Sequence, residues 1–368
     1  MRMTRSVTSK ADILVFKPLL GCATVRIKMA VRLKDIAEEL NLSVVTVSKV
    51  LRDHPDISDE TRNRVLKRMK ELNYRPNLAA RALVTGRSYA IGVVVPDLVH
   101  PFYGQVARAL SSKLRTHGYS LVLASSEDDP ELEQQEIEQL VARRVDVLIV
   151  ASTQREGDRF QHLDKQNIPY VLIDRRFKGL AANFVGVNDV LVGTIATKHL
   201  LDKGCRRVAH IGGPEVSTSL GRLQGYRDAL RSRGAHENPS YVAMREHGDD
   251  AGEKAGYIAM QRLLKLKPPP DGAFCFNDPT AMGAMKAALE AGVRVPNDLA
   301  IVGCGNVTYA DFLRVPLTSV DQQCDAIGER AAKLALTVLQ KRPAHPRTVL
   351  LQPSLVERAS SRRILRRP

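Results

Sequence analysis

A helical pattern of apolar residues opens the interpretable part of the sequence. In the segment LKDIAEELNLS, Leu33, Ile36, Ala37 and Leu40 recur at spacings of three and four residues. This spacing predicts a short helix with one buried face. Residues 41–43 break the pattern, and Ser43 can cap the helix that follows.

The second predicted helix runs from Val44 to Arg52 and buries Val47, Val50 and Leu51. A third follows Ser58, with acidic residues in its first turn and basic residues in its last, an arrangement that the helix dipole favours. Its expected inner face is Val65, Leu66, Met69 and Leu72. Three short helices with a three-residue turn between the first two match the helix-turn-helix plan.

The outward face of the second helix is where candidate chemistry appears. Once its apolar residues turn inward, the exposed positions are Val44, Val45, Thr46, Ser48, Lys49 and Arg52. A DNA-recognition helix would offer the valines to thymine methyl groups and the lysine to a guanine edge or a phosphate. The alternative is that the two valines pack on a neighbouring element.

The segment NYRPNLAARALVTGRS at 73–88 predicts one further helix. Pro76 ends the third helix, and Asn77 can cap a new one that reaches Leu83 or Val84. A helix of about eight residues is marginal alone in water, so we expect it to fold only against a partner. Leu83 would then be an apolar wedge that opens a base step from the minor groove; a plain linker is the alternative.

From Tyr89 onward, short apolar runs alternate with amphipathic stretches. The runs are AIGVVVPD, SLVLASS, VDVLIVA, YVLIDRR, FVGVND, RVAHIGGP, GAFCFND and LAIVGCG. This alternation predicts an α/β body of parallel sheets with helices on both faces. About 270 residues exceed what one sheet usually organises, so we expect two lobes.

Polar side chains follow several of these predicted strands. Asp97 and Phe102 follow the first strand, Asp174 and Arg175 follow YVLI, and Asn277 and Asp278 follow AFCF. Ligands of such folds bind at the carboxyl ends of the strands. Each residue alone could be a helix cap or a loop residue, but together they favour a polyol or sugar-like ligand that stacks on the phenyl ring.

Charge is concentrated at the two ends of the chain. Residues 1–88 hold 18 Lys and Arg against 9 Asp and Glu, residues 357–368 hold 5 against 1, and the 268 residues between them hold 32 against 30. A basic N-terminal segment on a nearly neutral body indicates a small phosphate-binding module joined to a larger domain. A solvated basic tail is the alternative for residues 1–28 and for the C-terminus.

Several classes of protein are disfavoured. The sequence contains no run of about 18 apolar residues, so it predicts no membrane-spanning helix. Its five cysteines are scattered and lack C-x-x-C spacing, which favours a reducing cytoplasm over a disulfide scaffold or a zinc site. The nine histidines lack metal spacing, and no phosphate-binding, hydrolase or metalloprotease motif occurs. We therefore expect no enzyme activity, no metal and no cofactor. A transport-type sugar-binding protein is the alternative, but it would need a secretory signal and would lack residues 30–84.

The string LKDIAEELNLSVVTVSKVLRDHPDISDETRNRVLKRMKELNYRPNLAARAL resembles the DNA-binding headpiece and hinge helix of the lactose/galactose-repressor family of bacterial transcription regulators. The resemblance continues through almost the whole chain to LQPSLVERASSRR. It implies that Val44, Val45 and Lys49 read bases and that Leu83 wedges into the operator centre. The candidate DNA-binding set is completed by Thr46, Ser48, Arg52, Tyr74, Asn77, Ala80 and Arg81.

The resemblance also places a small-molecule effector in a cleft between the two lobes. It implies that Arg222 holds effector hydroxyls or carboxylates and that Asp278 lines the same cleft. The effector-binding candidates are Phe102, Asp174, Arg175, Arg222, Asn277, Asp278 and Asn306.

This chain departs from the family pattern at four places. Arg32 stands where a capping Thr or Ser is usual. Lys49 replaces the commoner Arg and loses its bidentate fork, and Arg52 replaces a frequent Asn. In GCGN, Gly305 stands where many relatives have an aspartate, so an anionic effector becomes more plausible.

These observations predict five segments. They are an extension at 1–29, a helix-turn-helix domain at 30–76, a hinge helix and linker at 77–88, a two-lobed effector-binding and dimerisation domain at 89–356 and a basic tail at 357–368. The expected function is that of a homodimeric, cytoplasmic regulator. It would bind a pseudo-palindromic operator on double-stranded DNA and respond to a sugar-like effector, with no membrane partner.

Overall fold

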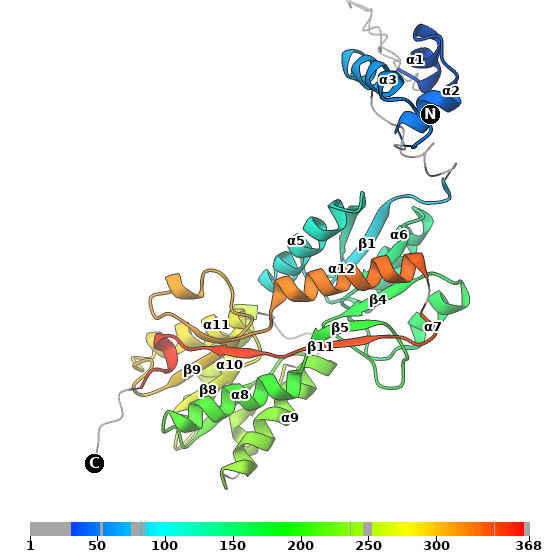
Figure 1. The fold of residues 1–368 in the computed structure, drawn as a ribbon. Coiled ribbons are helices and arrows are strands. Elements are labelled where there is room, and N and C mark those ends of the chain that lie inside the picture. The colour runs from blue at the N-terminus through cyan, green and yellow to red at the C-terminus, as the bar shows by residue number, and fades with distance from the viewer. Residues whose placement is uncertain are drawn as a thin grey trace, which may run out of the picture. The chain divides into compact units, whose positions relative to one another are not determined.

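The computed structural model describes residues 31–51, 54–74, 82, 85–235, 237–245, 252–341 and 343–363 (Figure 1). The chain divides into two compact units between residues 78 and 79, which we call the head and the body. The predicted extension at 1–29 and the segment 75–81 lie outside the described residues.

In its described residues the head contains three helices, α1 (Leu33–Glu39), α2 (Val44–Leu51) and α3 (Asp59–Glu71). The predicted cap at Ser43 is confirmed, because Ser43 accepts a hydrogen bond from Thr46 N at 3.0 Å. Ser58 caps α3 in the same way by accepting one from Thr61 N at 3.3 Å. At α1 the cap is reversed, since the Asp35 carboxylate accepts from Arg32 N at 2.8 Å.

The core of the head is smaller than the sequence pattern predicted. Its buried side chains are Ile36, Ala37, Val47, Val50, Val65 and Met69. Leu51 is 38% exposed and Leu66 is 47% exposed, so their placement on the inner faces was wrong. A helix turns by about 100° per residue, which puts both leucines at the edge of the stripe that their buried neighbours define.

The body contains two lobes, each built on a six-stranded sheet. The first sheet has the order β11-β5-β4-β3-β1-β2. Its strands are β1 (Ala90–Val95), β2 (Ser120–Ser125), β3 (Val147–Val150), β4 (Tyr170–Ile173), β5 (Phe184–Val187) and β11 (Thr348–Leu351). Its helices are α5 (Pro101–Arg115), α6 (Pro130–Ala142), α7 (Asp158–Lys165) and α12 (Cys324–Gln340).

The second sheet has the order β12-β10-β9-β8-β6-β7. Its strands are β6 (Val208–Ile211), β7 (Val242–Ala243), β8 (Gly272–Cys275), β9 (Ala300–Cys304), β10 (Thr318–Asp321) and β12 (Ser354–Val356). Its helices are α8 (Asp189–Asp202), α9 (Ser217–Ser232), α10 (Gly252–Leu263) and α11 (Asp278–Glu290), with 3-10 turns at Pro239–Tyr241, Ala310–Phe312 and Ala359–Ser361.

The fold class is therefore confirmed. Every pairing between neighbouring strands is parallel except that of β10 with β12. All eight apolar runs singled out in the sequence contain strands; β7, β10, β11 and β12 were not predicted. In Figure 1, α12 lies beside α5 on the first lobe and α8 lies beside α9 on the second. The chain passes between the lobes three times, after Val187, Asp321 and Leu351.

The start of the body is fastened to the first lobe. The Asp146 carboxylate accepts hydrogen bonds from Ser88 N at 2.8 Å and from Tyr89 N at 3.0 Å. The Arg87 guanidinium donates to Leu339 O, in the last turn of α12, at 3.3 Å. Residues 87–89, the first two of which end the predicted hinge helix and linker at 77–88, are thus an integral part of that lobe.

The end of the described chain packs on the second lobe. Ser360 and Ser361 are fully buried, and the Ser360 hydroxyl donates to Ile301 O at 2.6 Å. Arg358 donates to Leu317 O at 3.0 Å. The predicted tail at 357–368 is therefore wrong for residues 357–363, which close the second lobe because their polar groups satisfy its strand ends.

Glycines let α8 and α9 cross with their backbones in contact. A Cβ atom on Gly225 would lie 1.9 Å from Val190 O, and one on Gly193 would lie 2.0 Å from Arg222 O. No side chain fits in these gaps, so the crossing fixes the position of Arg222 on α9.

We expect Gly225→Ala to destabilise the body by about 3 kcal/mol or more, because the added methyl group must separate the two helices. The matched control is Gly104→Ala in α5, where nothing lies within 4 Å of the added carbon. That change should be neutral or stabilising by about 0.5–1 kcal/mol. Urea denaturation of both variants measures the difference; equal stabilities would contradict the tight crossing.

Candidate functional site

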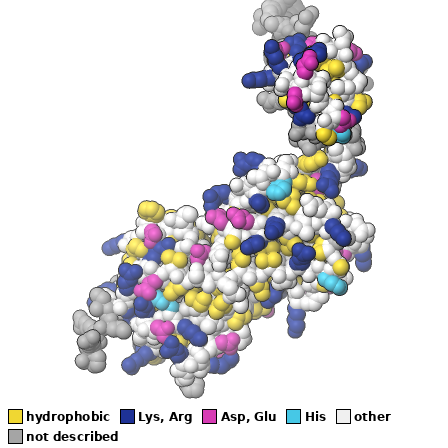
Figure 2. Space-filling model, viewed as in Figure 1, with side chains coloured by type: hydrophobic (Ala, Val, Ile, Leu, Met, Phe, Trp, Pro, Cys, Tyr) yellow, Lys and Arg dark blue, Asp and Glu magenta, His cyan; other side chains and the backbone are white. Residues whose placement is uncertain are grey.

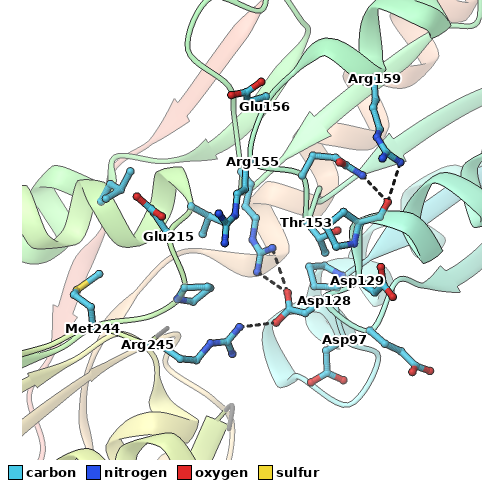
Figure 3. Close-up of a pocket in the computed structure, with 18 of the residues that line it drawn as sticks. Asp97, Asp128, Asp129, Thr153, Arg155, Glu156, Arg159, Glu215, Met244 and Arg245 are labelled. Carbon is cyan, nitrogen blue, oxygen red and sulfur yellow. Dashed lines mark hydrogen bonds and ion pairs between the residues drawn. The ribbon is translucent and has the colours of Figure 1, made fainter. Parts of the chain in front are cut away.

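A cleft with two connected parts lies where the carboxyl ends of the strands of both lobes meet. The inner chamber has a volume of about 140 Å³ and the outer chamber one of about 1320 Å³. Pro96, Asp97, Asp128, Arg175 and Arg245 line both. Figure 3 shows side chains from both lobes pointing into the outer chamber.

Five of the seven predicted effector residues line the inner chamber. Phe102, Asp174 and Arg175 come from the first lobe, and Arg222 and Asn277 come from the second. The structure thus brings together residues that are as far as 175 positions apart, as the strand-end argument required.

Arg222 is the most deeply buried cation of this group, with 2% of its surface exposed. Its Nε donates to Asp189 Oδ1 at 3.0 Å and its Nη1 donates to Phe276 O at 2.6 Å. The guanidinium also lies over the Phe276 ring, 4.7 Å from its centroid. Burial raises the pKa of Asp189 to about 7, although the neighbouring guanidinium opposes this shift.

Asp174 and Arg175 form the floor on the side of the first lobe. The Tyr103 hydroxyl donates to Asp174 Oδ2 at 3.1 Å, and Arg175 Nη1 donates to Ser152 O at 3.1 Å. Burial raises the pKa of Tyr103 well above its usual value. The phenol is therefore a permanent donor that holds the carboxylate in place.

Asp128 and Arg245 were missed by the sequence analysis, although they join the two lobes. Asp128 Oδ2 accepts from Arg245 Nη2 at 3.1 Å, and Asp128 Oδ1 lies 3.4 Å from Arg175 Nη1. One carboxylate therefore serves two guanidinium groups (Figure 3). The strand-end rule could have found the aspartate, which follows β2; the arginine follows the two-residue strand β7, which carries no apolar run.

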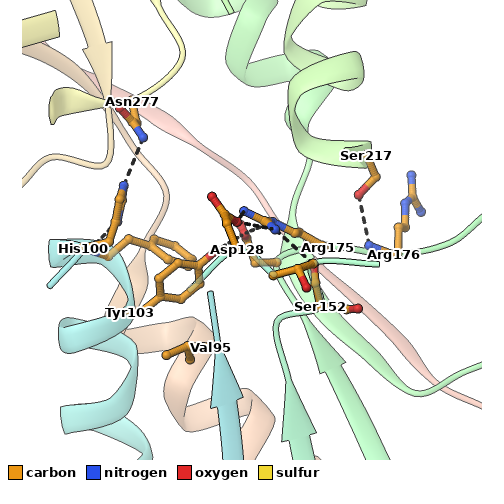
Figure 4. A network of polar contacts seen from close by, with 12 residues as sticks. Val95, His100, Tyr103, Asp128, Ser152, Arg175, Arg176, Ser217 and Asn277 are labelled. Carbon is orange, nitrogen blue, oxygen red and sulfur yellow. Dashed lines mark hydrogen bonds and ion pairs between the residues drawn. The ribbon is translucent and has the colours of Figure 1, made fainter. Parts of the chain in front are cut away.

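Two further hydrogen bonds connect the lobes (Figure 4). Asn277 Nδ2 lies 3.0 Å from His100 Nε2, and Arg176 N donates to the Ser217 hydroxyl at 3.0 Å. His100 also caps α5 by accepting from Phe102 N at 3.3 Å, and burial lowers its pKa. Phe102 N and Asn277 Nδ2 are both donors, and a neutral imidazole offers one acceptor nitrogen, so the ring can accept from only one of them at a time.

Three buried donors at the cleft have no hydrogen-bond partner among the described residues. They are the Nε atoms of Arg175 and Arg245 and the Nε2 atom of Gln322, and all three residues line the inner chamber. Unpaired buried donors cost free energy unless a ligand or water supplies acceptors. The chamber is therefore suited to a ligand rich in oxygen acceptors.

Asp278 and Asn306 lie outside the set of cleft-lining residues, so the structure does not bring them to the predicted ligand site. Asp278 is fully buried and accepts from Val307 N at 2.9 Å and from the Ser319 hydroxyl at 2.6 Å. Asn306 accepts from Arg358 Nη2 at 2.8 Å. Both side chains hold the loop after β9 and its neighbours, so their polarity serves the fold and the prediction that they bind the ligand was wrong.

On the head, the valines of α2 lie where the sequence predicted. Val44 is 43% exposed and Val45 is 62% exposed. The Thr46 hydroxyl lies 2.8 Å from the Ser43 hydroxyl, and Tyr74 packs against the head core. Figure 2 shows Lys and Arg side chains mixed with several acids on the visible face of the head.

Of the remaining predicted DNA-binding residues, the structure describes two. Ser48 and Lys49 lie on α2, and Lys49 Nζ is 2.6 Å from Asp56 Oδ2. Arg52, Asn77, Ala80, Arg81 and Leu83 lie outside the described residues.

Over the described ranges, no group of three or more His, Cys, Asp or Glu side chains could hold a metal ion. In the same part of the chain, no helix is long and apolar enough to cross a membrane.

A three-helix head joined to a two-lobed body with a polar interlobe cleft defines a ligand-controlled DNA-binding protein. Residues 32–77 match the family model "Bacterial regulatory proteins, lacI family", and residues 197–361 match "Periplasmic binding protein-like domain". The chain belongs to the lacI family, and it is a DNA-binding transcriptional regulator.

Relatives support this placement over most of the chain. The ribose operon repressor of Halalkalibacterium halodurans is 33% identical over 84% of this chain and 91% of its own length. The repressor CytR of Escherichia coli is 30% identical over 90% of this chain and 97% of its own.

Solved structures of similar proteins agree. The lac repressor dimer bound to operator and the anti-inducer ONPF has a TM-score of 0.80 at 26% identity, over 90% of this chain and 99% of that one. The complex of the transcriptional regulator CelR with cellobiose has a TM-score of 0.68 at 28% identity, over the same shares of the two chains.

The buried Asp278 should make stability depend on pH. Burial raises its pKa to about 6, so the folded state binds this proton more tightly than the unfolded state does. Its contribution therefore favours folding at about pH 4 and is lost as the pH rises to about 6, by roughly 2–3 kcal/mol in total. Between about pH 4 and pH 6, we expect the free energy of unfolding of the isosteric variant Asp278→Asn, measured in urea, to rise relative to that of the wild type. Above this range the difference between the two should stay constant. A constant difference from about pH 4 to pH 7 would contradict the raised pKa.

Proposed function

We propose that this regulator is a homodimeric repressor that binds a pseudo-palindromic operator and is controlled by a sugar-like effector in the inner chamber. The observation that carries the proposal is the convergence of Phe102, Asp174, Arg175, Arg222 and Asn277, from both lobes, on one small polar chamber. Carboxylate acceptors and guanidinium donors on the same wall suit a molecule with several hydroxyl groups.

Exposed apolar side chains support the homodimer. Phe312 is 86% exposed, Val99 is 88% exposed, and Leu123, on the edge strand β2, is 39% exposed. Each of these side chains leaves apolar area at the surface that a contact with a second molecule would bury. A second copy of the chain would pair two heads, as the two half-sites of a pseudo-palindrome require.

We assign the protein to the cytoplasm. Its DNA partner is there, and Cys205, Cys275, Cys304 and Cys324 are buried free thiols, which suits a reducing compartment.

Effector binding would act by favouring one arrangement of the lobes. Contacts that span the cleft, such as Asp128 with Arg245 and His100 with Asn277, exist only while the lobes are close. A ligand that contacts both lobes shifts this equilibrium by its difference in affinity for the two arrangements. The shift reaches the DNA only if it changes the separation of the paired hinge segments.

A thermal-shift screen of the full chain against sugars, sugar acids and sugar phosphates tests the effector site. A ligand at about 100 times its Kd should stabilise the body by about 2.7 kcal/mol. Arg222→Ala should abolish both the shift and the effector response while DNA binding persists, and Arg222→Lys should weaken the shift because the ammonium lacks the fork of the guanidinium. The control Arg294→Ala removes an exposed arginine of the same lobe, which forms an ion pair with Asp298, and should keep the full shift. An unchanged shift in both Arg222 variants would move the site elsewhere.

The wedge predicted at Leu83 gives a separate test on the DNA side. We expect Leu83→Ala to weaken operator binding by about 1–3 kcal/mol, because the bent base step loses its apolar support, and to leave effector affinity intact. Fluorescence anisotropy with a selected operator duplex measures the first and thermal shift the second. Leu350→Ala, at a 40% exposed leucine on β11, is the control. Equal operator affinity of wild type and Leu83→Ala would remove the wedge from the mechanism.

A further inference from the structure

An acidic side chain holds the lysine that the proposed function assigns to base reading. Lys49 Nζ, on α2, lies 2.6 Å from Asp56 Oδ2, in the loop between α2 and α3. The other carboxylate oxygen contacts His54 Nδ1. A carboxylate on this face is unexpected, since it repels the phosphates that the basic head must approach.

The loop holds this carboxylate in position. His54 N donates to Lys49 O at 3.1 Å, which continues the last turn of α2, and Ile57 N donates to His54 O at 3.3 Å. The next side chain, Ile57, packs against the head core. Arg62, from α3, donates to His54 O at 3.2 Å. Asp56 therefore lies between a partly buried side chain and a hydrogen-bonded backbone turn, and its carboxylate contacts the lysine.

Stabilising the head is a poor explanation for this pair. The Lys49 side chain is 35% exposed and that of Asp56 is 49% exposed, and ion pairs this open to water contribute little to folding. What the contact does is restrict the lysine. A free lysine is a flexible point charge with three donors, which binds whichever phosphate is nearest; a held lysine keeps a fixed position at the surface of α2.

We propose that Asp56 is a specificity-determining residue that acts through Lys49. By engaging one ammonium donor and neutralising the charge, it suppresses attraction to phosphates of any sequence and leaves the other two donors for a base edge. The proposal rests on the proposed function, because it takes Lys49 as a DNA-contacting residue. An arginine at position 49 would distinguish bases through its two parallel donors. In this chain, the acidic loop residue would supply part of that sequence selectivity by holding the lysine in place.

The test is a double-mutant cycle on the full chain. Wild type first selects a duplex from a library with a randomised core; the Kd for that duplex and for a scrambled duplex of equal composition is then measured at several salt concentrations. We expect Asp56→Asn to bind the scrambled duplex about fivefold more tightly. Its salt dependence there should steepen by about 0.9, the value of one further phosphate contact. Affinity for the selected duplex should rise less, so that the ratio of the two affinities falls.

Two controls separate this role from plain charge repulsion. In a Lys49→Ala background, Asp56→Asn should change the scrambled-duplex affinity by less than about twofold, because the cation that it would release is gone. Glu38→Gln removes an equal charge from α1, where the carboxylate pairs with Lys34 at 3.6 Å, and should preserve the ratio. An unchanged melting temperature of Asp56→Asn would show that the head folds normally.

The outcomes distinguish the two levels of the argument. If wild type discriminates but Asp56→Asn has the same effect with and without Lys49, or if Glu38→Gln lowers the ratio equally, this inference is overturned and the proposed function stands. If wild type enriches no sequence at all, the proposed function fails and the inference fails with it.

Discussion

The site depends on one constraint, namely that two parallel sheets end at the same gap. Parallel strands place all their carboxyl ends on one edge, and each lobe turns that edge toward the other. Residues just after β4, from the start of α5 and from the start of α11 therefore reach the same chamber without any proximity in sequence. The tight crossing of α8 and α9 adds Arg222 to this edge, since Gly193 and Gly225 admit no side chain between the helices.

Charge pairing gives the cleft its character. Asp128 accepts from one arginine of each lobe, and Asp189 accepts from Arg222, so the buried guanidinium groups are compensated before any ligand arrives. Desolvating these cations unpaired would be costly. What remains available is a small set of directed donors on a nearly neutral wall. Such a wall recognises a ligand through the geometry of its oxygen atoms more than through its charge.

The sequence predicted the architecture and most of the chamber, because both follow from periodicity. Phe102, Asp174, Arg175 and Asn277 were found by their position just after apolar runs. Asp278 follows the same rule but faces inward, because a helix-starting carboxylate also satisfies the backbone of the next loop; no spacing distinguishes the two uses. Arg245 was missed because β7 is two residues long. The exposure of Leu51 and Leu66 depends on how three helices cross, which a stripe on a single helix does not specify.

The pairing of Lys49 with Asp56 was equally invisible to pattern reasoning, since it joins a helix to a loop seven positions away. Residue types alone suggested a free cation at the head surface. The structure shows that its charge is already engaged, so that the basic composition of the head overstates the positive potential at this point.

The fastening of Ser88 and Tyr89 to Asp146, together with the Arg87 contact to α12, has a mechanical consequence. The first residues of the body belong to the first lobe, and these hydrogen bonds connect them to that lobe. We expect a displacement of the second lobe to move these residues only if it also moves the first lobe. A cleft movement that leaves the first lobe in place would then not reach the linker, whereas one that rotates the first lobe as a rigid body would.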